Sequence, residues 1–480
     1  MDAKRALIAL TVVGGLFRFG TLDLQSYWLD EAATVELVTL DLSGMLHRVP
    51  DSESSPPLYY VLAWLWTQVF GSGEVGLRSL SALFGTASIP VAYAAAAELC
   101  SRRVGLIVAA LAAVSPVLVW YSQEARAYSL LILLGGLSLW SFARLLNRPS
   151  GTAAAAWAVS SALALATHYF AAFLVLPEAV WLAAVPAARR RALPAQACVA
   201  ATAAALLPLA LHQRSLGLAT FIADESLALR LARAAKGFLL GFESPLEVAL
   251  TVLASAVAGI AALAGVRLAR RAGDRGVRKA AVIGGAAVAV PLLLALVDVD
   301  YFDTRNLLAA WLPLMVVVGG GLAAHRIGLA GLAVLCAAGL ASVVGVALEP
   351  TWQRDDWRGM AEALGPADAP RVLVVQPASG RRPLGVYLDE LSPLPDRGRR
   401  VAELASVYPV RRGMGGAHPA PPPRGGAAPL AGFSLGRPRL SDTYSIFPQR
   451  APAPQPIAPV QARGLVLVAG EPFAVLLQRP

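Results

Sequence analysis

The stretch I-G-L-A-G-L-A-V-L-C-A-A-G-L-A-S-V-V-G-V-A-L, residues 327–348, decides the fold class of this chain. It contains no charged side chain and is long enough to cross a hydrocarbon layer of about 30 Å as a helix. Similar uncharged runs occur at residues 79–97, 104–122 and 248–266. Of all 480 residues, 56% are hydrophobic and only 15% are charged, whereas soluble proteins carry about 25% charged residues. The sequence therefore predicts a polytopic membrane protein.

Basic side chains in the short loops predict the orientation of the spans. Lys4 and Arg5 place the amino terminus in the cytoplasm, where the positively charged loops of membrane proteins collect. The later basic clusters fall on the same side if the chain crosses about eleven times. We predict spans at residues 6–22, 79–99, 104–122, 127–143, 152–167, 169–187, 195–213, 247–266, 280–297, 306–324 and 327–348.

Residues 56–70 are apolar but are only about 15 residues long, which is short for a crossing. We expect them to form a helix at the outer interface, where aromatic side chains such as Tyr59, Tyr60, Trp64 and Trp66 are favoured. An odd number of spans then places the carboxyl terminus outside. The predicted location is the plasma (inner) membrane, as a multi-pass protein. In this setting the net charge of +10 reflects topology, and no nucleic-acid partner is expected.

The composition divides the chain into two predicted domains. Residues 1–348 form the transmembrane domain, and residues 349–480 form a small extracytoplasmic α/β domain. Residues 371–376, 465–469 and 473–478 have the composition of strands. Residues from about 409 to 459 are rich in Pro and Gly, so we expect a flexible segment there. The three cysteines are far apart and indicate neither a disulfide framework nor a metal site.

The first outer loop carries the motif Y-W-L-D-E-A at residues 27–32, directly after the first span. A carboxylate that follows a membrane exit and is backed by aromatic rings can be partly dehydrated, as a general base requires. Asp30 and Glu31 are therefore candidate catalytic residues. The alternative is that the pair is a solvated acidic loop.

Other outer turns carry further charged motifs. Residues 120–128 read W-Y-S-Q-E-A-R-A-Y, in which Glu124 and Arg126 lie close to hydrocarbon, where charge is costly unless paired or functional. The alternative role is a local ion pair between them that anchors the turn. His168 follows another span and can be an interfacial anchor. Arg305 stands at the mouth of a late span, where it can bind a phosphate or extend its guanidinium to the interface.

Three further features are weaker indications. Arg18 lies near the outer end of the first span and can reach the same site, whereas Glu178 is an intramembrane acid far from the outer motifs. The loop at residues 214–244 carries Arg230 and further basic residues at helical spacing. Such a stretch suits an ordinary interfacial helix or one that faces a lipid phosphate.

The ordered set of motifs resembles the GT-C glycosyltransferases of family 39 type, which include protein O-mannosyltransferases and bacterial lipid A aminoarabinose transferases. The matching residues occur in the family's order over roughly the first 310 positions. They are W-L-D-E-A at 28–32, S-P-P-L-Y-Y at 55–60, F-G at 70–71 with Glu74 and Arg78, Y-S-Q-E-A-R-A-Y at 121–128, H-Y at 168–169 and R-N at 305–306. Family members often carry His where this chain has Ser55 and Tyr where it has Asn306. The D-D-W-R motif at residues 355–358 matches only loosely.

The resemblance implies an all-α polytopic GT-C fold with outer interfacial helices, and an inverting transfer. The sugar, mannose or another hexose or pentose, would pass from a polyprenyl-phosphate donor to a hydroxyl of a glycan, lipid or protein acceptor. Asp30 would be the general base, with Glu31 beside it and Glu124 as an accessory carboxylate. Arg305, Arg126 and His168 would bind the donor phosphate. The substrate cleft is predicted to include Tyr59, Tyr60, Tyr128 and Arg18.

Two other functions stay open at this level. A flippase or transporter of lipid-linked sugars needs polar residues along a path across the bilayer, whereas the polar motifs here collect on one side. A polysaccharide ligase would carry its key basic residues in a large late loop, and the loop at residues 214–244 is short for that role. No cofactor is indicated by the sequence, and the involvement of a divalent cation is left open.

Overall fold

A computed structural model describes residues 2–218, 220–271, 274–409 and 427–480. These residues group into two compact units. The first unit contains Met1–Leu22 and Leu37–Gly345, and the second contains Asp23–Glu36 and Val346–Pro480. A short piece of the first outer loop therefore groups with the carboxy-terminal residues.

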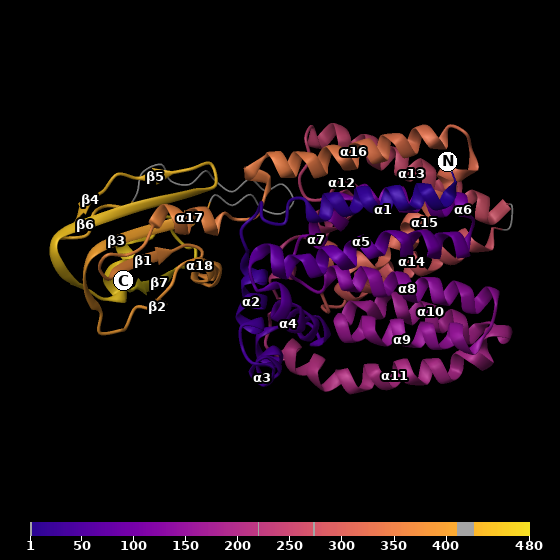
Figure 1. Ribbon diagram of the computed structural model, residues 1–480, viewed down its shortest axis with the longest axis horizontal. Helices are drawn as coiled ribbons and strands as arrows, with labels where there is room; N and C mark the ends of the chain where they lie inside the picture. Colours follow the sequence, from indigo (N-terminus) through magenta and orange to yellow (C-terminus); the bar gives the residue numbers. More distant parts are fainter. Residues whose placement is uncertain (1, 219, 272–273, 410–426) are drawn as a thin grey trace. The chain divides into compact units, whose positions relative to one another are not determined.

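The first unit is a bundle of helices, most of which run roughly parallel (Figure 1). Its 3₁₀ segments are η1 (Tyr169–Ala171), η2 (Thr220–Asp224) and η3 (Thr304–Ala310). Its α-helices are α1 (Ala3–Phe19), α3 (Leu42–Ser52), α4 (Leu58–Phe70), α5 (Glu74–Leu99), α6 (Arg102–Val114), α7 (Pro116–Ser122), α8 (Tyr128–Asn147), α9 (Gly151–Thr167), α10 (Ala172–Ala184), α11 (Pro186–Ser215), α12 (Leu227–Leu240), α13 (Glu247–Arg271), α14 (Arg275–Ala295), α15 (Trp311–Ala324) and α16 (Gly328–Leu348). α16 continues three residues past the boundary of the unit.

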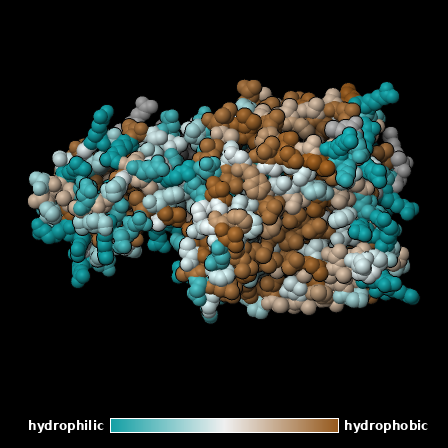
Figure 2. All heavy atoms as spheres, in the orientation of Figure 1, coloured by the Kyte–Doolittle hydropathy of each residue, from teal (hydrophilic) through white to brown (hydrophobic). Residues whose placement is uncertain are grey.

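The predicted fold class is confirmed: the chain is a helical multi-pass membrane protein. Among the described residues, seven helices are long and apolar enough to cross a membrane, or eight if α6 and α7 form one bent span. The shorter helices α9 and α10 run alongside the long ones in Figure 1. Helix α4 is only 13 residues long, as expected for residues 56–70. Figure 2 shows an apolar surface on the visible face of the bundle and polar side chains at the end where α1 begins.

One predicted span is broken in two. Helices α6 and α7 meet at a bend of 57°, where Pro116 opens α7 and prevents a continuous helix. Arg18 is fully buried beside the break. Its guanidinium donates to the carbonyl oxygens of Ala112 (2.9 Å) and Ala113 (3.1 Å), at the carboxyl end of α6. Carbonyls that lack a partner at the helix end are thus satisfied by a side chain.

Among its described residues, the second unit contains a seven-stranded mixed sheet in the order β2-β7-β1-β3-β6-β4, with β5 paired to β6. Strands β1 and β3 are parallel, and the other pairs are antiparallel. The strands are β1 (Arg371–Val375), β2 (Leu391–Pro393), β3 (Arg399–Pro409), β4 (Ser434–Leu435), β5 (Arg439–Leu440), β6 (Tyr444–Ile457) and β7 (Ala474–Gln478). The helices are α2 (Leu29–Val38), which extends two residues into the first unit, and η4 (Pro350–Trp352), α17 (Trp357–Leu364), η5 (Ala378–Gly380), α18 (Arg381–Tyr387), α19 (Pro459–Ala462) and η6 (Arg463–Leu465).

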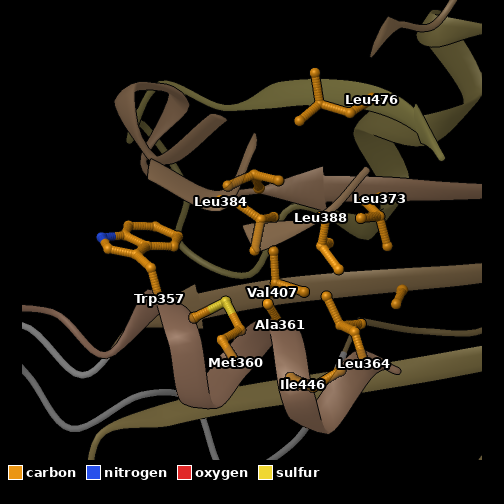
Figure 3. Close-up of a cluster of buried hydrophobic side chains, with 12 residues drawn as sticks. Trp357, Met360, Ala361, Leu364, Leu373, Leu384, Leu388, Val407, Ile446 and Leu476 are labelled. Carbon is orange, nitrogen blue, oxygen red and sulfur yellow. The ribbon is translucent and has the colours of Figure 1, made fainter. Parts of the chain in front are cut away.

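Both faces of this sheet are covered. Alternate residues of β1 enter separate cores, with Leu373 and Val375 on one face and Val372 and Val374 on the other. Trp357 of α17 packs in the first of these cores (Figure 3). A Cβ atom at Gly380 would lie only 2.1 Å from its indole ring, so glycine permits the close approach. The start of α17 is therefore a well-packed part of this unit.

Two expectations for the carboxy-terminal domain were wrong in part. Residues 371–376 and 473–478 contain β1 and β7, but residues 463–465 form the turn η6 and the following residues run irregularly. There the amide groups of Leu467 and Val468 donate to Gln376 Oε1 at 2.6 and 3.2 Å. The Gln376 side chain thus accepts the backbone hydrogen bonds that a neighbouring strand would accept in a sheet.

The Pro- and Gly-rich segment from 409 to 459 was expected to be flexible, but it contains β6. Residues 410–426 lie outside the described part. Within β6, the carbonyl of Pro448 accepts from Gly436 N at 2.8 Å, on the side away from β3. The N and O of a strand residue point to the same side, so Pro448 interrupts no bond to β3. Proline is tolerated at such outer positions.

Candidate functional site

The predicted outer turn between α7 and α8 is fixed by its own polar side chains. Gln123 Nε2 donates to the carbonyl of Phe17 (2.8 Å) and to Thr21 Oγ1 (2.6 Å), so it closes the carboxyl end of α1. The hydroxyl of Ser129 donates to the carbonyl of Tyr121 at 2.7 Å. These bonds hold residues 122–128 as a compact turn, in which Glu124 is fully buried.

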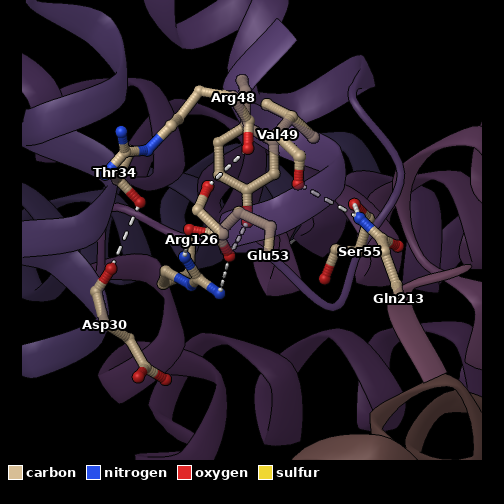
Figure 4. A network of polar contacts seen from close by, with 10 residues as sticks. Asp30, Thr34, Arg48, Val49, Glu53, Ser55, Arg126 and Gln213 are labelled. Atoms are coloured by element: carbon tan, nitrogen blue, oxygen red, sulfur yellow. Dashed lines mark hydrogen bonds and ion pairs between the residues drawn. The ribbon is translucent and has the colours of Figure 1, made fainter. Parts of the chain in front are cut away.

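Arg126 forms a buried ion pair with Glu53, as Figure 4 shows. Two guanidinium nitrogens donate to the two carboxylate oxygens of Glu53 at 3.1 and 2.8 Å, and the side chains are only 8% and 3% exposed. The hydroxyl of Tyr60 donates to the same carboxylate at 2.6 Å. Arg126 also lies over the Tyr60 ring, with its guanidinium carbon 5.7 Å from the centroid.

Glu53 is the site residue that sequence reasoning missed. Arg126 was considered for a local ion pair with Glu124, and the structure gives it an ion-pair partner 73 positions away that was not considered. Between these two neighbours the structure has a backbone bond, from Arg126 N to the Glu124 carbonyl at 2.8 Å. The available signal was that Glu53 directly precedes the S-S-P-P-L-Y-Y motif.

The structure brings His168 together with two predicted phosphate-binding arginines. His168 is buried and lies against Tyr128 and Phe170, with ring centroids 5.6 and 5.0 Å away. Burial is the main cause that lowers its pKa, to about 3, and the positive charges of Arg126 and Arg305 add to the effect. His168 is thus neutral near pH 7 and interacts electrostatically with both Arg126 and Arg305. Three separate turns between helices contribute to this cluster.

Arg305 lies on 3₁₀ segment η3 and is mostly covered. Its side chain is 15% exposed, its Nε is 3.6 Å from Asp303 Oδ1, and its guanidinium lies 5.1 Å from the ring centroid of Phe221. Asp303 also caps η3 by accepting from Arg305 N at 3.0 Å. The ring of Phe170, which contacts His168, also contacts the ring of Tyr301, with the two centroids 5.5 Å apart. The cation therefore lies near the Phe221 ring and the Asp303 carboxylate.

Three basic residues of the loop at 214–244, namely Arg230, Arg233 and Lys236, form ion pairs with acids. Arg230 of α12 forms two hydrogen bonds to Asp300, at 2.7 and 2.6 Å, and these bonds lower the pKa of Asp300. In the same loop, Arg233 pairs with Glu225 and Lys236 pairs with Glu247. These contacts connect the loop to neighbouring parts of the chain.

Asp30 and Glu31 belong to the second unit, where they lie in the first turn of α2. Glu31 is fully buried and Asp30 is half-buried. The Thr34 hydroxyl donates to the Asp30 carbonyl at 3.3 Å (Figure 4).

The remaining predicted residues are buried in the bundle. The Tyr59 hydroxyl is 3.0 Å from Ser81 Oγ, and Arg18 binds the α6 carbonyls described above. Glu178 of α10 accepts from Ser138 Oγ (2.5 Å) and Trp157 Nε1 (2.8 Å), which links three neighbouring helices. Among the residues described, no three His, Cys, Asp or Glu side chains come together in a way that could bind a metal ion.

Known proteins share parts of this sequence and fold. Residues 54–212 match the family described as dolichyl-phosphate-mannose-protein mannosyltransferase. No curated protein sequence matches the chain. The matched region includes Tyr59, Tyr60, Glu124, Arg126 and His168.

Two solved structures have a similar fold. ArnT from Cupriavidus metallidurans bound to undecaprenyl phosphate has a TM-score of 0.51 at 13% identity, covering 80% of this chain and 85% of that one. The oligosaccharyltransferase from Archaeoglobus fulgidus in the apo form has a TM-score of 0.50 at 13% identity, covering 75% of this chain and 57% of that one. Together with the family match, these similarities confirm the resemblance to GT-C glycosyltransferases and the GT-C type of fold.

Proposed function

We propose that this protein is a membrane glycosyltransferase that moves a sugar from a polyprenyl-phosphate donor to a hydroxyl group outside the cytoplasm. The cluster around His168 carries the proposal, because Arg126 and Arg305 both act on this buried residue among the rings of Tyr128 and Phe170. Cations near aromatic surface suit a phosphate attached to a sugar and a prenyl chain. The fold similarity to ArnT with bound undecaprenyl phosphate supports the same donor class.

In the proposed reaction Asp30 removes the proton of the acceptor hydroxyl as its oxygen bonds to the anomeric carbon. The bond from that carbon to the phosphate oxygen breaks, and polyprenyl phosphate leaves with the electron pair. Arg305, together with the positive field of Arg126, stabilises the negative charge that develops on the phosphate. His168 is neutral and can donate or accept one hydrogen bond to the donor. Attack opposite the leaving group inverts the anomeric centre.

The other predicted residues have supporting roles in this proposal. Glu31 and Glu124 orient the acceptor and the base, and Tyr59, Tyr60 and Tyr128 contribute to the cleft that receives the sugar. The sugar class is mannose or another hexose or pentose. The acceptor is a glycan, lipid or protein.

Replacement of Asp30 by Asn tests the proposed base. A general base typically contributes about 10²–10⁴-fold in rate, so Asp30→Asn should reduce transfer by that factor and leave donor binding intact. The assay incubates membranes with radiolabelled polyprenyl-phosphate sugars, one at a time, and identifies the labelled product. Turnover of Asp30→Asn equal to that of the wild type would remove Asp30 from this role.

Arg305→Gln is the complementary control, because it should weaken donor binding. Charge-assisted hydrogen bonds contribute about 1.5–3 kcal/mol, which corresponds to an increase of roughly 10- to 150-fold in the donor KM. If the wild type moves the lipid-linked sugar across vesicle membranes and labels no acceptor, the protein is a transporter and the proposal is wrong.

A further inference from the structure

The R-D-D-W-R motif at residues 354–358, at the start of the carboxy-terminal domain, makes contacts that the proposed reaction does not explain. It lies in the same unit as Asp23–Glu36, the part of the first loop that carries Asp30 and Glu31. We propose that the carboxy-terminal domain positions this segment, so that Gln25, Ser26 and Tyr387 are positioning residues for the base. This inference deepens the proposed function and rests on it.

Two buried side chains of the segment bind the motif. Ser26 is 3% exposed and Gln25 is 5% exposed. The Ser26 hydroxyl donates to the Asp355 carbonyl at 2.8 Å and accepts from Trp357 N at 3.0 Å. Gln25 Oε1 accepts from the backbone N of Arg354 (3.1 Å) and from its guanidinium (3.3 Å).

Further contacts follow on both sides of these residues. The backbone N of Tyr27 donates to the Tyr387 hydroxyl at 2.6 Å, and Arg358 donates to the Asp23 carbonyl at 2.9 Å. At the far end of the segment, Arg382 Nε lies 3.2 Å from Glu36 Oε1. The contacts therefore lie on both sides of Asp30 along the chain.

The residues of the carboxy-terminal domain that bind the segment are themselves fixed by packing and hydrogen bonds. Trp357 donates its backbone N–H to Ser26 while its indole is 2% exposed in the domain core. Asp356 caps α17 by accepting from Gly359 N (2.9 Å), and it also accepts from the Thr443 hydroxyl (2.9 Å). A segment bound to such a part of the domain has little freedom to shift. Because a misplacement of about 1 Å can reduce a catalysed rate about 10²-fold, fixing the segment matters for a base.

Tyr387→Phe and Gln25→Leu test the proposal in the full-length protein, because each removes a hydrogen-bonding side chain that connects the segment to the domain. Hydrogen–deuterium exchange should become faster in peptides that cover residues 23–36 and stay unchanged in β3. The kcat should fall by up to about 100-fold, whereas the donor KM should not change. Gln25→Glu keeps an acceptor oxygen, so its hydrogen–deuterium exchange at residues 23–36 and its kcat should both be close to those of the wild type.

Ser406→Ala is the matched control. It removes a buried hydroxyl of the same domain, which donates to the Leu465 carbonyl at 2.7 Å, so exchange at residues 23–36 should stay at the wild-type level. Unchanged exchange in Tyr387→Phe and Gln25→Leu would overturn the proposal, as would faster exchange in β3 as well, because that would indicate a general loss of domain stability. If exchange changes as expected but the wild type transfers no sugar, the anchoring stands and the proposed function fails.

Discussion

The turn at residues 122–128 and the segment Asp23–Glu36 both carry carboxylates proposed for the reaction, yet different chemistry holds them. In the turn, a charged guanidinium pairs with a buried carboxylate of the same helical unit. In the segment, mostly neutral hydrogen bonds connect it to the sheet domain of the same unit. Charge fixes the part proposed to bind the donor, and backbone contacts fix the part proposed to carry the base.

The largest effect is expected from breaking the ion pair of the turn. Removal of one partner of a buried ion pair typically costs about 3–5 kcal/mol. Glu53→Leu should therefore lower the free energy of unfolding of the purified protein by that amount, as measured by denaturant unfolding in detergent. The double variant Glu53→Leu/Arg126→Leu should lose less than either single variant.

The exposed pair between Arg148 and Glu98 provides a comparison for this experiment. Its arginine side chain is 71% exposed, so Arg148→Leu should change the stability by at most about 1 kcal/mol. If the losses in the Glu53 and Arg126 variants simply add, the two residues do not act as a pair, and the contrast between turn and segment disappears.

A smaller effect is expected from pH at His168. Its pKa in the folded protein is about 3, below the ordinary value of about 6.5, so the unfolded chain binds more protons between these values. The stability should therefore fall as the pH is lowered from about 6.5 towards 3. His168→Gln should show a smaller loss over that range. Melting temperatures of both proteins at pH 7.5 and pH 5 measure the difference, and equal losses would show that His168 titrates normally.

The smallest effect is expected at the outer contact of the segment. Glu36 and Arg382 are 48% and 30% exposed, and such pairs contribute at most about 1 kcal/mol. Arg382→Glu should slightly increase hydrogen exchange at the carboxyl end of residues 23–36, and the charge swap Glu36→Arg/Arg382→Glu should reverse it. A swap that leaves exchange as fast as in the single variant would show that the pair contributes nothing to the anchoring.

The sequence predicted the helical membrane fold because long uncharged runs have few alternative structures. Turns between helices were predicted at 122–128 and at His168 because polar motifs interrupt such runs. The partner of Arg126 was not predicted, since it lies 73 positions away in an unremarkable S-E-S-S stretch. Strand β6 was missed because its prolines are compatible with a strand only at positions that its neighbours define. Pairings between distant parts of the chain thus account for most of the errors.

Arg18 also has a consequence for how the protein is made. An arginine inside a span raises the free energy of insertion by up to about 3 kcal/mol on translocon scales, and α1 is not among the helices that qualify as spans by length and composition within the described chain. Its carbonyl partner on α6 is synthesised 95 residues later. The first helix therefore becomes fully stable in the bilayer only after α6 has left the ribosome, which makes early biogenesis a cooperative step between two distant helices.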